Sequence, residues 1–107
     1  MTNSQKTSPL EFIKEENKAH QVVVWSKTYC PYCKKTKELF KSMEGLDVVV
    51  HEIDTEKDGY RLQQELYRLT GQKSVPNVFV NNVHVGGNDD TQAAYKTGAL
   101  QKLLTAQ

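Results

Sequence analysis

The chain has 107 residues, 37% of them hydrophobic, which suffices for one domain with a buried core. Its net charge of +1 gives no support to nucleic acid or a membrane surface as a partner. No apolar run approaches the roughly 18 residues of a membrane-spanning helix, and residues 1–9 lack the apolar core of a signal peptide. We therefore expect a single domain over residues 1–107, located in the cytoplasm, with residues 1–8 as a flexible tail.

Hydrophobic periodicity and helix-stop residues predict the secondary structure. The expected elements, in chain order, are a helix from Pro9 capped by Ser8, a strand over 22–25, a helix over 34–44, a strand over 47–53, a helix over 60–69, two strands over 77–80 and 83–85, and a last helix capped by Asp89 or Asp90. Gly45 and Gly71 end two of these helices, and Gly98 is placed to break the last one.

The order of the elements predicts the sheet. A strand, a helix and a second strand in succession favour a parallel pair with a right-handed crossover. The two strands around Asn81-Asn82 favour an antiparallel hairpin, because Asn tolerates positive φ. The simplest packing is an α/β fold with a mixed four-stranded sheet and helices on both faces.

Two cysteines, Cys30 and Cys33, are the only ones in the chain, and they lie where a strand is followed by a helix. This placement is typical of a redox-active dithiol. The helix amino terminus, together with Lys27, Lys34 and Lys35, favours the thiolate form of Cys30. Cys30 precedes the helix proper and should be exposed, whereas Cys33 lies one turn in and should be shielded. We therefore expect Cys30 to be the nucleophile and Cys33 the resolving thiol.

A zinc site is the main alternative for the two cysteines, with His20, His51 or His84 completing it. His51 and His84 sit inside predicted strands without the paired spacing of usual zinc ligands, so we expect no metal.

Two further segments can be interpreted either as part of a binding site or as ordinary structural features. If Pro76 in Ser74-Val75-Pro76 faces the dithiol, the backbone groups of Val75 are free to pair with a peptide-like substrate. Residues 86–90 (GGNDD) couple a glycine turn to a helix start, which suits the carboxylate and ammonium of an amino-acid head. Taken alone, each segment is more simply a loop proline or a capped helix.

Together, residues 27–33 (KTYCPYC), 74–76 (SVP) and 86–90 (GGNDD) resemble the signature segments of dithiol glutaredoxins. The resemblance runs from about residue 22 to about residue 104, and the chain is most similar in type to the small fungal cytosolic enzymes. It implies a thioredoxin-like fold with Pro76 in the cis form. It also implies glutathione as electron donor and co-substrate.

The resemblance further implies a glutathione site. Lys27 and Gln63 would pair with the glycine carboxylate, and the Val75 backbone with the cysteinyl unit. Asp89 and Asp90 would hold the γ-glutamyl head. The remaining residues of the implied site are Tyr32, a wall of the groove, and Ser74 and Pro76. Ser74 stands where the family usually has Thr, and it keeps the hydroxyl.

The expected function is therefore a glutathione-dependent thiol-disulfide oxidoreductase of electron transport and cell redox homeostasis. Its expected partners are glutathione and proteins that are glutathionylated or carry disulfides, and we expect a monomer that binds neither nucleic acid nor a membrane. Two alternatives stay open on the sequence. One is an enzyme of the thioredoxin type, fed by a reductase. The other is an iron–sulfur carrier dimer ligated by Cys30 and glutathione, which the stiff Pro31 disfavours.

Overall fold

The computed structural model describes residues 8–106, so the expected tail lies outside the described residues except for Ser8. The elements are α1 (Pro9–Ala19), β1 (Val22–Ser26), α2 (Pro31–Lys41), β2 (Val48–Glu52), the 3-10 helix η2 (Ile53–Thr55), α3 (Gly59–Thr70), β3 (Asn77–Val80), β4 (Val83–Gly86), α4 (Asn88–Thr97) and α5 (Ala99–Thr105). The Ser8 hydroxyl accepts the Glu11 backbone N–H at 3.1 Å, and the Glu11 carboxylate accepts the Ser8 N–H at 3.2 Å. Ser8 therefore belongs to a capping box rather than to a tail.

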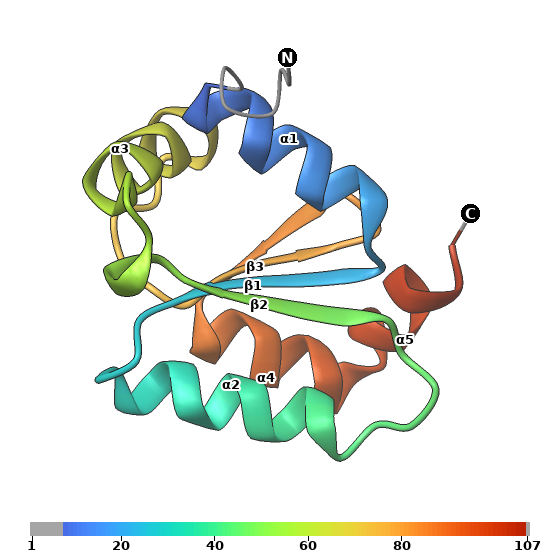
Figure 1. Cartoon of the computed structure of the whole chain (residues 1–107). Coiled ribbons are helices and arrows are strands. Elements are labelled where there is room, and N and C mark those ends of the chain that lie inside the picture. Colours follow the sequence, from blue (N-terminus) through green and yellow to red (C-terminus); the bar gives the residue numbers. More distant parts are fainter. Residues whose placement is uncertain (1–7, 107) are drawn as a thin grey trace.

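The sheet has four strands in the order β2-β1-β3-β4. β1 pairs in parallel with β2 and antiparallel with β3, and β3 pairs antiparallel with β4. In Figure 1, α1 and α3 lie on one face of the sheet, and α2, α4 and α5 lie on the other. This arrangement confirms the expected mixed sheet covered on both faces. The hairpin turn is also as expected, with φ of 47° at Asn81 and 66° at Asn82.

Side chains of β1 contribute alternately to two buried clusters, one on each face of the sheet. Val23 and Trp25 belong to the cluster beneath α1 and α3, whereas Val22 and Val24 belong to the one above α2, α4 and α5. All five residues of β1 are buried, which explains the continuous apolar run in the sequence. The chain therefore leaves a rigid central strand just before it reaches Cys30.

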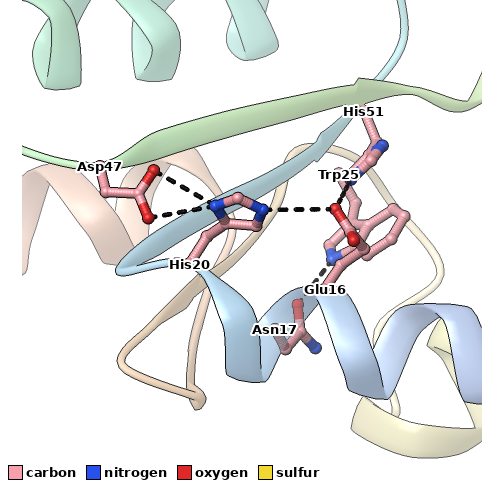
Figure 2. Close-up of polar contacts among 6 residues, drawn as sticks. All are labelled: Glu16, Asn17, His20, Trp25, Asp47 and His51. Carbon is pink, nitrogen blue, oxygen red and sulfur yellow. Dashed lines mark hydrogen bonds and ion pairs between the residues drawn. The ribbon is translucent and has the colours of Figure 1, made fainter.

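A buried hydrogen bond fastens α1 to the central strand. The indole Nε1–H of Trp25 donates to Oδ1 of Asn17 at 3.0 Å, and both residues are buried (Figure 2). The His51 ring stacks on Trp25 with centroids 4.5 Å apart. The polar asparagine in the core is thus explained by the indole N–H that it satisfies.

Two histidines and two carboxylates form a row of polar contacts that extends from the Trp25 ring to Asp47 (Figure 2). Oε1 of Glu16 lies 2.8 Å from Nε2 of His51 and 3.7 Å from Nε2 of His20, and Nδ1 of His20 lies 3.1 Å from Asp47. Over residues 8–106, no three or more His, Cys, Asp or Glu side chains form a group that could hold a metal ion. In the same part of the chain, no helix is long and apolar enough to cross a membrane.

Two helix starts differ from the prediction. α2 begins at Pro31 instead of residue 34, because Cys30 itself is the N-cap. α4 begins at Asn88 with Gly87 as its N-cap, so the expectation that Asp89 or Asp90 occupies the cap position was wrong. Gly98, with φ of 88°, separates α4 from α5, as its position in the sequence predicts.

Candidate functional site

The thiol of Cys30 lies at the amino terminus of α2. Its Sγ accepts the backbone N–H of Cys33 at 3.2 Å, in the way that a serine hydroxyl caps a helix. The backbone N–H of Cys30 donates to the Lys27 carbonyl at 3.3 Å, which closes the turn after β1. Cys30 remains partly exposed. The geometry therefore combines access for a substrate with an N–H that favours negative charge on sulfur.

The second thiol has a different environment. Cys33 has an exposed fraction of 0%. Burial, reinforced by a hydrogen bond to the Cys30 side chain, raises the pKa of the Cys33 thiol to about 11. Cys33 is therefore a neutral thiol near pH 7 and is buried, whereas Cys30 is partly exposed.

The segment before β3 faces the dithiol. The Val75-Pro76 peptide bond is cis, as the resemblance implies. Sγ of Cys30 lies 3.7 Å from the Val75 carbonyl oxygen, and the Cys30 thiol can donate a hydrogen bond to that oxygen. The loop therefore brings backbone polar groups next to the reactive sulfur, where an extended peptide can pair with them.

A cleft of about 440 Å³ opens beside Cys30. Its lining residues come from α2, from the loop before β3 and from the start of α4: Tyr32, Gln72, Ser74, Val75, Pro76, Gly87, Asn88, Asp89 and Asp90. All three sequence segments singled out above thus contribute to one cleft. Gln72 was not predicted, because a polar residue after the helix-ending Gly71 carries no local signal of a role.

Lys27 and Gln63 do not line this cleft. They line a second one, of about 330 Å³, together with Tyr29 and residues of η2 and the start of α3. Gln63 also donates from Nε2 to the Lys73 carbonyl at 2.9 Å. Tyr29 precedes Cys30 and Tyr32 follows it, so the two clefts flank the segment that carries the reactive thiol.

A carboxylate fixes the loop ahead of Cys30. Asp54 accepts the backbone N–H of Thr28 at 3.0 Å and also the Thr28 hydroxyl. The hydroxyl hydrogen bond is the main cause that lowers the pKa of Asp54. The sequence analysis placed Asp54 in a polar turn and did not anticipate this contact, which joins residues 26 positions apart.

At the other end of the first cleft, Asp90 has a structural contact as well. Its Oδ2 accepts the backbone N–H of Gly87 at 3.2 Å. The carboxylate packs so closely on Gly86, where φ is 125°, that a Cβ at this position would clash with it. The glycine at position 86 lets the carboxylate approach this closely, and Asp90 serves the start of α4 whatever else it binds.

A buried hydrogen bond ties the two helices of the site together. The Thr36 hydroxyl of α2 donates to Oδ1 of Asn88 in α4 at 2.9 Å, and both side chains are buried. The distance between the dithiol and the acidic start of α4 is thereby fixed by the core.

Comparison with known proteins agrees with this geometry. A family model described as Glutaredoxin matches residues 22–85. Glutaredoxin-C4 of Arabidopsis thaliana is 44% identical over 105 residues, which cover 97% of this chain and 77% of that protein. The structure of a buckwheat glutaredoxin–glutathione complex superposes with a TM-score of 0.87 at 36% identity, covering 98% of this chain and 94% of the other. A wheat glutaredoxin structure gives a TM-score of 0.85 at 46% identity, covering 91% of each chain.

These relatives are plant proteins, so the similarity to fungal enzymes stays a prediction. The thioredoxin-like fold is confirmed by the likeness to glutaredoxin structures. The match over most of the chain also decides between the two classes of dithiol enzyme that the sequence left open. The chain belongs to the glutaredoxin family of glutathione-dependent thiol-disulfide oxidoreductases, and its Cys30–Cys33 spacing is that of the dithiol type.

Proposed function

We propose that this protein uses glutathione to reduce protein–glutathione mixed disulfides and protein disulfides, with Cys30 as nucleophile and Cys33 as resolving thiol. The observation that carries this proposal is the asymmetry of the pair. Sγ of Cys30 is partly exposed and accepts a helix N–H at 3.2 Å, whereas Cys33 is buried with a pKa raised to about 11. Two-step disulfide exchange needs one thiolate that attacks the substrate and a second, protected thiol that reacts only afterwards.

Removal of glutathione from a protein needs only Cys30. Its thiolate attacks the glutathionyl sulfur, the mixed disulfide breaks, and the substrate thiolate leaves and takes up a proton. Glutathione is then held on Cys30 as a disulfide. A second glutathione thiolate attacks that disulfide, which releases oxidised glutathione and restores the Cys30 thiolate. In the net exchange one free glutathione is consumed: the protein–glutathione mixed disulfide and glutathione become the protein thiol and oxidised glutathione.

Reduction of a protein disulfide uses both thiols. Cys30 attacks one sulfur and forms a mixed disulfide with the substrate. Cys33, once deprotonated, attacks Sγ of Cys30, so that the reduced substrate leaves and a Cys30–Cys33 disulfide remains. Two glutathione molecules then reduce this disulfide. Glutaredoxin couples lie at about −200 to −230 mV, within reach of the cytosolic glutathione pool.

The two clefts flanking Cys30 support a specific placement of glutathione. The Val75 backbone would pair with its cysteinyl unit, beside the sulfur that reacts. Asp89 and Asp90 in the first cleft would bind the γ-glutamyl ammonium, and the N–H groups at the start of α4 its carboxylate. Lys27 and Gln63 in the second cleft would bind the glycine carboxylate. The glutathione complex of the buckwheat relative supports this use of the fold.

Tyr32, Ser74 and Pro76 would complete the walls of the first cleft. The Tyr32 ring is mostly exposed, with an exposed fraction of 57%, and Nζ of Lys35 lies 5.5 Å from its centroid. The proposal includes a monomeric protein acting in the cytoplasm, in electron transport and redox homeostasis.

Turnover of a glutathionylated peptide with glutathione tests the proposal in wild type, Cys30→Ser and Cys33→Ser. We expect wild type and Cys33→Ser to be active and Cys30→Ser to be inactive. If Cys33→Ser were also inactive on this substrate, the one-thiol route would be wrong. If wild type were inactive and the anaerobically purified protein were brown, an iron–sulfur carrier would replace the enzyme proposal.

A further inference from the structure

One glutamine side chain spans the loop that carries Val75. Nε2 of Gln72 donates to the Ser74 carbonyl at 2.9 Å and to the Pro76 carbonyl at 2.9 Å. These two carbonyls belong to the residues immediately before and after Val75. The two N–H groups of a single amide thus hold the backbone on both sides of the residue that faces Cys30.

The orientation of this amide is determined by its partners. Carbonyl oxygens only accept hydrogen bonds, so the NH₂ end of Gln72 has to face Ser74 and Pro76. Oε1 then points the other way, and it lies 3.2 Å from Nε2 of His84 on β4. Nε2 of His84 must therefore carry a hydrogen. Burial lowers the pKa of His84, against a smaller opposing effect of Asp90, so the ring is neutral near pH 7 with its proton on Nε2.

The backbone of Gln72 is anchored too. Its N–H donates to Oγ1 of Thr70 at 3.0 Å, at the end of α3. Gln72 thereby connects three parts of the fold: the end of α3, the loop before β3, and β4. The Val75 carbonyl takes no part in this network and instead lies 3.7 Å from Sγ of Cys30.

We propose that Gln72 is a positioning residue, which holds the Val75 backbone in the orientation that pairs with the peptide part of a glutathionylated substrate. This inference rests on the proposed function. Gln72 itself does not touch the reacting sulfur atoms; it acts through the loop. Loss of the amide would release two carbonyls, and the loop would have to be ordered again each time that substrate binds.

Gln72→Met tests this role, because Met has nearly the same length and volume and no donor. We expect KM for a glutathionylated peptide to rise about tenfold with a smaller change in kcat, as for lost binding that is equal in ground and transition states. The alkylation rate of Cys30 by iodoacetamide, which needs no peptide pairing, should stay within about twofold. Gln64→Met is the matched control, since Gln64 is an exposed glutamine on α3 whose Nε2 donates to Tyr60 Oη at 3.3 Å and not to the loop before β3.

An unchanged KM in Gln72→Met would overturn the proposal. So would an equal loss in turnover and in Cys30 alkylation, since that pattern indicates a general structural role. If Gln72→Met did not fold, His84→Leu would test the same network, with an expected rise in KM of about threefold from one lost hydrogen bond; no rise would count against it. Inactive wild type would instead refute the proposed function, so the two failures are distinguishable.

Discussion

Sγ of Cys30 lies 3.2 Å from the backbone nitrogen of Cys33, so the sulfur of the first cysteine caps the helical turn that carries the second. The N–H of Cys33 donates to the Cys30 sulfur, while the Cys33 side chain is completely buried. One local structure therefore produces both an accessible sulfur and a protected one.

Alkylation should distinguish the two thiols by pH. Because burial raises the pKa of Cys33 to about 11 from its ordinary value near 9, its thiolate fraction stays small until the pH approaches 11. Reduced wild type treated with iodoacetamide at pH 8 should show one adduct by mass spectrometry, on Cys30. A second adduct should appear only near pH 11 or after denaturation. Equal rates for both cysteines at pH 8 would contradict the buried, neutral Cys33.

The charge of Asp90 can be separated from its helix contact. Asp90→Asn keeps an oxygen that can accept the Gly87 N–H but removes the negative charge. We expect KM for a glutathionylated peptide to rise about tenfold, through loss of a charged partner for the ammonium, with the melting temperature unchanged. Asp90→Ala should show the same rise and also lose about 1 kcal/mol of stability. If Asp90→Asn kept the wild-type KM, the carboxylate would serve only the start of α4.

Asn17→Leu should destabilise the fold without touching the clefts. It leaves the buried Nε1–H of Trp25 without its partner, which costs about 1–3 kcal/mol in the free energy of unfolding. Urea denaturation measures this loss. In Asn17→Leu with Trp25→Phe no orphaned donor remains, so the two changes together should cost less than the sum of the single ones. Strict additivity would show that the hydrogen bond contributes nothing.

Protonation of Asp54 should lower the stability of the folded protein at acid pH. Its pKa is lowered in the folded protein, chiefly by the Thr28 hydroxyl, so the folded state favours the carboxylate. The resulting stabilisation is present above the unfolded pKa of about 3.9 and is lost as the pH falls through the lower folded value. Asp54→Asn should therefore flatten the fall of the melting temperature between neutral and acid pH. Asp58→Asn is a control, because its side chain makes no cap hydrogen bond at α3; an equal flattening there would contradict the assignment.

Most of the fold could be predicted from local patterns. The apolar run of β1 indicated a strand covered on both faces, and the Asn81-Asn82 pair indicated the hairpin turn. The starts of α2 and α4 could not be predicted as well, because their N-caps are Cys30 and Gly87. Cysteine is not among the common N-cap residues, and Gly87 has no side chain with which to mark the cap beside the aspartates that follow it.

Some residues of the site could also be predicted from the sequence, and others could not. Tyr32, Val75 and Asp90 stand out in sequence motifs, and all three line one cleft. Gln72 and Asp54 do not stand out, because their partners are backbone groups that come within reach only after the chain has folded. Roles carried by three-dimensional contacts with main-chain atoms leave no pattern in the residue types.

The complete burial of Cys33 also bears on how this protein withstands peroxide. Damage follows thiolate character and exposure, so oxidation begins at Cys30 and yields a sulfenic acid there. Cys33, untouched, can then condense with that sulfenic acid to give the disulfide and one molecule of water. The sulfenic acid is thereby converted to a disulfide that glutathione reduces, before a second oxidation can turn it into an irreversible sulfinic acid.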